Sequence, residues 1–145
     1  MTQRLTFTAP AILAPQPVAR AGETIDAGPL ESLPAAWQCD LADDSLTWAP
    51  GVFALFGVPR EHRLDRREIV AMYAPESRTM LDYLRSHAIA TCGSFTFEAR
   101  IVRADGAERW MRLTADTAHA GGRATHLYGL KQDITADVAA GVIRP

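Results

Sequence analysis

Residues 93–135 read GSFTFEARIVRADGAERWMRLTADTAHAGGRATHLYGLKQDIT, and this stretch decides the fold. In residues 95–101 apolar side chains alternate with polar ones, a period of two that places each set on one face of a strand. Asp105-Gly106 and Gly121-Gly122 each tolerate the positive φ angles that a two-residue hairpin loop needs. We therefore expect a meander of three antiparallel strands, with the second strand over residues 109–118 and the third over 124–132.

The residues before this meander supply two further strands. Ala36–Leu41 and Ser45–Trp48 are short runs of strand-forming residues on either side of the turn-forming residues 42–44. We expect both to join one edge of the sheet. An isolated sheet would leave an apolar face in water, so a covering layer is also needed.

Three helices between the two groups of strands provide that layer. Pro50 suits the first turn of a helix, and Gly57 suits the left-handed residue that ends it. Asp65 and Glu68 resemble an N-capping pair, in which the Asp side chain accepts a free amide and the Glu side chain reaches back.

The third helix is the longest and runs from Pro75 to Gly93. Its apolar residues recur at intervals of three and four, which predicts that one face packs on the sheet: Met80, Leu81, Leu84, Ala88 and Ile89. After the last strand, Asp133 or Thr135 can cap a short helix through Ala140. The sequence thus predicts an α+β fold with one five-stranded antiparallel sheet covered on one side.

Composition and charge limit the possible functions. A chain of 145 residues with 48% hydrophobic and 22% charged residues is typical of one globular domain. Its formal net charge of -2 does not favour nucleic acid or an anionic membrane, and no segment could cross a bilayer. Cys39 and Cys92 are too few for a disulfide framework and lack the spacing of a zinc site. We expect a cytoplasmic protein without a metal site.

Several short motifs follow one another in a fixed order. They are AWQCDL at 36–41, LTWAPGVFALFG at 46–57, Pro75 with Glu76 and Arg78, FTFEARIVRADG at 95–106, Arg109-Trp110, Gly129, and Asp133-Ile134-Thr135. Together they resemble a PAS domain of the bacterial fold-3/PAC type. The resemblance implies a PAS domain over residues 35–135, preceded by an Ala- and Pro-rich tail or cap (1–34) and followed by a short helix or tail (136–145).

The chain departs from the family in two places. Residues 74–78 read APESR, where the family often has His-Pro-Glu/Asp-Asp-Arg. Only ten residues follow Thr135, whereas relatives commonly continue into a coiled coil and an output domain. We expect a free-standing PAS protein, and a piece cut from a longer sensor is the alternative.

The resemblance also implies a pocket between the sheet and the helices. Its candidate lining consists of aromatic and long side chains that could surround a small organic ligand: Phe53, Met80, Tyr83, His87, Phe97, Trp110 and Tyr128. Aromatic residues at strand spacing are more often core residues, so a filled core is the competing interpretation.

No cofactor is predicted. Haem-binding relatives place a histidine on the long helix, where this chain has His87, but a histidine there more often bonds to carbonyls or water. The flavin-binding light sensors carry an Asn-Cys-Arg-Phe-type motif that this sequence lacks. Cys92 has no nearby cation that would lower the pKa of its thiol, so it is no candidate for an adduct.

The outer face of the sheet suggests a partner. On the second meander strand Trp110 alternates with Met111, and on the third Tyr128 alternates with Leu127, so both faces carry apolar residues. The N-terminal tail, a second subunit or a signalling partner would cover the outer face. Replacing Tyr128 by Asp should then give monomers.

The residues point to a regulatory module and not to an enzyme. No nucleophile, base and orienting group occur together, and there is no phosphate-binding glycine loop. We expect a sensory PAS module in signal transduction that dimerises or docks on a partner, with or without a ligand. A pure interaction module is the alternative, and a small α+β enzyme with a cavity is the least favoured one.

Overall fold

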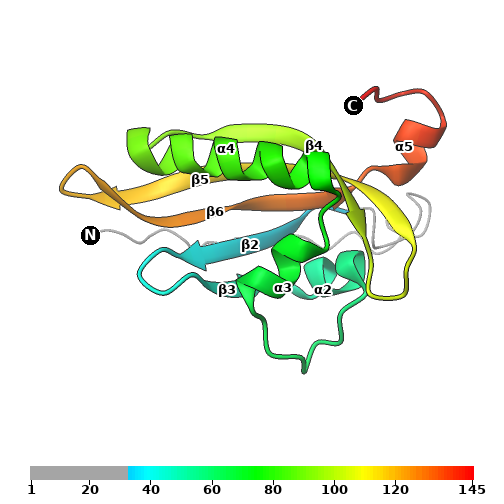
Figure 1. Cartoon of the computed structure of the whole chain (residues 1–145), viewed down its shortest axis with the longest axis horizontal. Coiled ribbons are helices and arrows are strands. Elements are labelled where there is room, and N and C mark those ends of the chain that lie inside the picture. Colours follow the sequence, from blue (N-terminus) through cyan, green and yellow to red (C-terminus); the bar gives the residue numbers. More distant parts are fainter. Residues whose placement is uncertain (1–32) are drawn as a thin grey trace, which may run out of the picture.

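The computed structural model describes residues 33–145, and residues 1–32, which contain nearly all of the predicted tail, lie outside them. One antiparallel sheet has the strand order β3-β2-β6-β5-β4 (Figure 1). Its strands are β2 (Ala35–Asp40), β3 (Ser45–Trp48), β4 (Phe95–Val102), β5 (Glu108–Ala120) and β6 (Arg123–Asp133). The helices are α2 (Pro50–Phe56), α3 (Arg66–Ala71), α4 (Pro75–Thr91) and α5 (Thr135–Ala139). The predicted fold class is confirmed.

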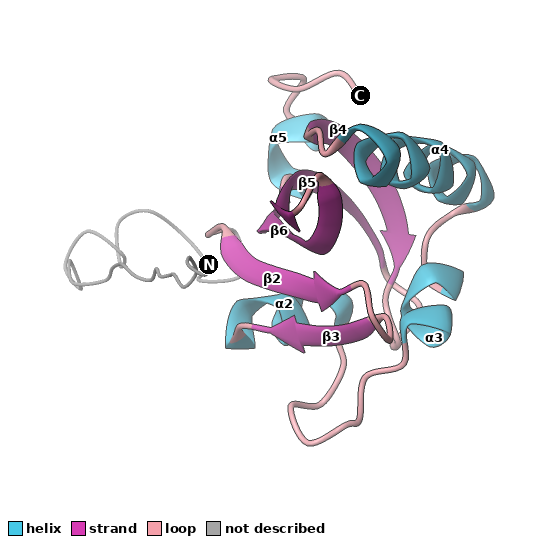
Figure 2. Cartoon of the chain, turned by 90° about the vertical axis from the view of Figure 1, so that its left-hand side faces the viewer, coloured by secondary structure: helices cyan, strands magenta, loops and turns pink. Residues whose placement is uncertain are grey.

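The helices α3 and α4 lie against the same side of the curved sheet (Figure 2). The strand residues that face them are buried and alternate with more exposed ones, as in the burial of Met111, Leu113 and Ala115 on β5. Apolar residues of β2 and β3 and of the helices complete this core: Trp37, Trp48, Val52, Leu55, Phe56, Ile69, Tyr73, Leu81 and Ala88. Burial of this single apolar layer is the main force that holds the sheet and helices together.

The β5–β6 turn follows the prediction and the β4–β5 turn does not. Gly121 and Gly122 have φ angles of 58° and 79° and form a two-residue turn between Ala120 and Arg123. The β4–β5 loop is longer, because Arg103 donates its N–H to the carbonyl of Ala107 at 2.8 Å outside the strands. Asp105 accepts the Ala107 amide at 3.0 Å, which stabilises this longer loop.

The helix ends follow the prediction except at the start of α3. Helix α4 ends before Gly93, and Cys92 takes the left-handed conformation after it, with a φ of 53°. At α3, Asp65 accepts the amide of Arg67 at 2.9 Å as expected, but the Glu68 carboxylate contacts the His62 ring at 3.3 Å. The predicted stop at Gly57, with a φ of 69°, is confirmed.

Gly129 lets a tryptophan cross the central strand. Trp37 on β2 pairs with Gly129 on β6, and its indole Nε1 donates to the carbonyl of Thr114 on β5 at 3.1 Å. A Cβ at position 129 would collide with that same Thr114 carbonyl. The missing side chain therefore permits a close approach that links three strands.

We predict that Gly129→Ala lowers the free energy of unfolding by roughly 2–3 kcal/mol, because a methyl group would meet backbone that cannot move aside. Chemical denaturation measures the loss. The control is Gly121→Asn, at a φ of 58° with nothing within 4 Å, where Asn is tolerated. A Gly129→Ala variant as stable as this control would contradict the proposed crossing.

Candidate functional site

Lys131 is a charged residue type placed inside the core. It is the only lysine among the 15 lysine and arginine residues of the chain, and only 5% of its surface is exposed. It lies on β6 two residues after Gly129 and four after Leu127, so strand alternation places it on the face covered by the helices. An amine in this position loses its hydration, which costs several kcal/mol unless other groups replace the water.

Aromatic rings surround the amine. The Lys131 Nζ lies 4.9 Å from the ring centroid of Phe56, 5.3 Å from Trp37, 5.4 Å from Trp48 and 5.9 Å from Tyr73. Each distance is within the range of a cation–π contact, so the rings favour the charged amine. We call these four residues the aromatic cage.

Burial of the amine disfavours its charged form. Loss of hydration, with a smaller contribution from the Arg66 guanidinium, lowers the pKa of Lys131 from 10.5 to about 7. No carboxylate of the described residues forms an ion pair with this amine. Near neutral pH the amine is therefore close to the point where it gains or loses its proton.

The amine has one hydrogen-bond partner among residues 33–145, the hydroxyl of Tyr73. Lys131 Nζ donates to Tyr73 Oη at 3.4 Å. Burial raises the pKa of Tyr73 above its usual value, so this hydroxyl stays protonated and offers a neutral oxygen. The contact does not neutralise the amine.

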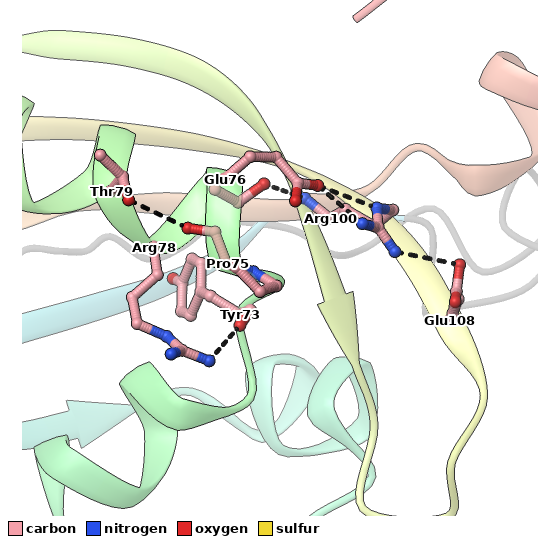
Figure 3. A network of polar contacts seen from close by, with 8 residues as sticks. Tyr73, Pro75, Glu76, Arg78, Thr79, Arg100 and Glu108 are labelled. Carbon is pink, nitrogen blue, oxygen red and sulfur yellow. Dashed lines mark hydrogen bonds and ion pairs between the residues drawn. The ribbon is translucent and has the colours of Figure 1, made fainter.

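A polar network fixes the backbone around Tyr73 (Figure 3). Arg78 donates to the carbonyl of Tyr73 at 2.9 Å, and Arg100 on β4 binds Glu76 at 2.7 Å. Tyr73 also forms an isolated antiparallel bridge with Ile101. The link between α3 and α4 is thus joined to the edge strand, which holds the Tyr73 side chain against the core.

A cavity of about 40 Å³ lies between α3, α4 and the sheet. Its apolar wall contains Leu46, Ile69, Val70, Leu81, Phe95, Leu113 and Leu127, and the rest is lined by Trp37, Cys39, Tyr73, Arg66, Arg85 and Lys131. One water needs roughly 10–15 Å³ by this measure, so the space holds about three waters or a very small organic molecule.

The charged lining of the cavity is entirely cationic. Arg66 on α3, Arg85 on α4 and Lys131 on β6 reach it, and no Asp or Glu does. Arg85 is paired outside the cavity with Asp44 at 2.8 Å. Arg66 has neither an ion pair nor a side-chain hydrogen bond within residues 33–145, and burial followed by the nearby Arg85 lowers its pKa. The Asp44 carboxylate offsets part of this charge, and the lining keeps an excess of positive charge.

A family model described as PAS fold matches residues 45–130, more than half of the chain. The chain belongs to the PAS family. No curated protein sequence matches it closely enough to count as a relative.

Solved structures with the same fold include PAS domains of bacterial signalling proteins. The N-terminal domain of a diguanylate cyclase with PAS/PAC sensor from Marinobacter aquaeolei is similar with a TM-score of 0.67 and 17% identity, over 73% of this chain and 99% of that one. A sensory box histidine kinase/response regulator from Burkholderia thailandensis is similar with a TM-score of 0.64 and 14% identity, over 86% of this chain and 91% of that one. An RNA-binding light-oxygen-voltage receptor is similar with a TM-score of 0.62 and 14% identity, over 76% of this chain but 34% of that one. At these identities the likeness shows the fold alone.

Large PAS cofactors do not fit this cavity. Pockets for drug-sized ligands measure roughly 300–1,000 Å³, many times the 40 Å³ found here. His87, the candidate haem ligand, is exposed on α4 and stacks on Tyr83 with ring centroids 6.4 Å apart. Neither haem nor flavin is accommodated without rearrangement of the core.

The sequence-predicted pocket residues lie in several places. Met80 and Tyr83 are 46% and 66% exposed on α4, because the helix face that meets the sheet is the one with Leu81 and Ala88. Trp110 and Tyr128 alternate with buried residues of β5 and β6 and so belong to the other face of the sheet. Their roles as ligand contacts stay predictions.

Two predicted residues do lie on the helix side of the sheet. Phe53 meets the Trp48 ring edge-on at 5.1 Å, and Phe97 packs near Phe95 at 6.2 Å. Both are partly buried against the core, but neither they nor the other five predicted residues line the 40 Å³ cavity. The structure does not bring the seven residues together.

Sequence reasoning missed Lys131, Arg66 and Arg85. The sequence does contain a signal for Lys131. It is the only lysine, and strand alternation places it on the same face of β6 as Leu127 and Gly129. The two arginines carry no such signal, because at least half of the residues of each helix are exposed and only the packing decides which side chains turn inward.

We predict that Lys131→Met stabilises the protein by roughly 1–4 kcal/mol near pH 7, because it replaces a poorly solvated amine by an apolar chain of similar size. The unfolded chain keeps this lysine protonated up to about pH 10.5, and the folded chain only up to about 7. Between these values the unfolded state binds more protons, so wild-type stability rises with pH and the advantage of the variant shrinks. Denaturation from pH 7 to 10 tests this, and parallel pH profiles of the two proteins would contradict it.

Proposed function

We propose that this protein is a sensory PAS module of a signal-transduction system, in which a small molecule in the cavity alters contacts with a protein partner. The observation that carries this proposal is a cavity with three cationic side chains, one of them the uncompensated amine of Lys131. A buried amine with no matching carboxylate costs stability, and such costs concentrate at functional sites. The proposed action is a shift in packing and not a reaction.

The strand β6 offers a short route from the cavity to the C-terminal helix. Lys131 and Asp133 lie on this strand, and the Asp133 carboxylate accepts the amide of Thr135 at 2.9 Å. The Thr135 hydroxyl in turn accepts the Trp110 amide of β5 at 2.9 Å. A displacement of β6 at Lys131 would therefore reach α5 within four residues.

The partner in this proposal is a second copy of the chain or another signalling protein. Leu130 is 45% exposed on β6, on the face opposite Lys131, and it lies beside the cross-strand neighbours Thr114 and Ala36. No helix among residues 33–145 meets the length and hydropathy needed for a membrane span. We propose a cytoplasmic setting, as expected from the sequence.

A constitutive interaction module without a ligand is the second candidate. The small volume of the cavity, about 40 Å³, favours it because most of the core is filled by side chains. In that case the outer face alone would carry the function.

Native mass spectrometry of the purified protein, compared with its denatured mass, distinguishes the two. We expect a small extra mass on the folded species that disappears on denaturation. A folded species of unmodified mass that remains dimeric on dilution would overturn the sensory proposal in favour of the interaction module.

We also predict that Thr135→Val loosens α5, because it removes the hydroxyl that accepts the Trp110 amide. Amide hydrogen exchange in residues 135–140 should speed up, with a stability loss of about 1 kcal/mol. Thr47→Val, at an exposed position of β3, is the matched control. Unchanged exchange in α5 would contradict the route through β6.

A further inference from the structure

The cavity has the chemical features of a binding site for a small organic anion. Three cations line it and no acid does, and only Arg85 is paired with a carboxylate, that of Asp44. An uncharged occupant would therefore leave the repulsion between Arg66 and Lys131 in place. The opposite wall is aliphatic and aromatic, which suits a short hydrocarbon tail. An inorganic anion would leave this apolar wall without a matching group.

Two of the cations are available to a ligand. Arg66 forms no ion pair within the described residues, and Lys131 has only the Tyr73 hydroxyl as a hydrogen-bond partner there. Arg85 is already paired with Asp44 at 2.8 Å, so it contributes less. One negative charge between α3 and β6 would match this arrangement.

The size of the cavity limits the ligand further. About 40 Å³ accommodates about three waters, whose liquid volume of roughly 90 Å³ is that of a molecule with about four or five non-hydrogen atoms. Acetate and propionate have this size and combine a planar carboxylate with a short apolar tail. Dicarboxylates and aromatic acids exceed it.

We propose that this cavity binds a short-chain monocarboxylate, with the carboxylate held by Arg66 and Lys131 and the alkyl end against the apolar wall. This inference rests on the proposed sensory function, to which it adds the class of ligand.

Binding of such an anion changes the protonation of Lys131. The groups that face this amine are the Arg66 and Arg85 guanidiniums from the helices, the neutral hydroxyl of Tyr73 and the Cys39 thiol on β2. Burial raises the pKa of the Cys39 thiol, so none of these groups supplies a negative charge near neutral pH. The Asp44 carboxylate acts on Arg66 and Cys39 from outside the cavity lining, but it is paired with Arg85 at 2.8 Å. A bound carboxylate would supply an anion inside the cavity and would favour the protonated amine.

The single lysine makes the test direct. Protein labelled with ¹³C at the lysine Cε gives one side-chain signal, whose titration reports Lys131 alone. We expect sodium propionate, at constant ionic strength, to move the midpoint of this titration to higher pH. The affinity should fall about tenfold for each pH unit above the midpoint of the free protein.

Matched variants test the two residues proposed to hold the carboxylate, Arg66 and Lys131. Arg66→Gln and Lys131→Met should each weaken propionate binding at least tenfold in calorimetry. Arg67→Gln, at the next position of α3 with a side chain 93% exposed, should change it less than twofold. Circular dichroism of each variant checks that the fold is retained.

Three results would overturn the inference. These are no response of the lysine signal to propionate or acetate, an equal response to propionamide or sodium chloride, and equal binding by Arg66→Gln and Arg67→Gln. None of them decides the proposed sensory function, because native mass spectrometry detects a ligand of any chemistry. An extra mass from a neutral molecule would keep the sensory role and reject the carboxylate.

Discussion

One amine is enclosed by an aromatic cage, and the packing of the core around the cavity has to accommodate it. Lys131 comes from β6, and the four rings come from β2, β3, α2 and the link between α3 and α4. Five separate parts of the chain must therefore be in place before the amine is enclosed. Tyr73, which supplies both a ring and a hydroxyl, is held by the edge strand β4 through its bridge to Ile101.

Position 131 holds a lysine and not an arginine, and the two residue types differ in how readily they lose their charge. Arginine serves as the cation at every other basic position of the chain, and a guanidinium stays charged at any physiological pH. An amine can release its proton when it is buried, so the core tolerates it without a carboxylate partner. The four rings favour the charged amine through cation–π contacts, whereas the loss of hydration on burial lowers its pKa to about 7. The result is a group whose charge depends on what occupies the neighbouring cavity.

Local signals were sufficient to predict most of the fold. Strand alternation, the Gly121-Gly122 turn and the stop at Gly57 each depend on a few adjacent residues, and the structure agrees with all three. The β4–β5 loop was predicted too short because Asp105-Gly106 fits more than one loop length, and the Arg103–Ala107 hydrogen bond selects the longer form.

The binding cavity was less predictable, because it depends on which face of each helix meets the sheet. Tyr83 and His87 are one turn apart on α4 and looked like candidates, yet they stack on each other on the solvent side. Arg66 and Arg67 are adjacent arginines with no local difference, and only the packing of α3 turns the first inward. Which helix side chains face the sheet depends on how the helices pack against it, and short sequence motifs do not specify that packing.

Helix α3 buries little apolar surface, and this affects how fast a ligand can enter and leave the cavity. This helix has six residues and buries only Ile69, so it is the cheapest part of the cavity wall to open. The strands on the other side include β2, β6 and β5, which are paired along both edges, so their opening costs more free energy. Brief local opening of α3 would therefore widen the access to the cavity, and the exchange rate of a ligand would depend on the packing of Ile69 as well as on the ligand's own contacts.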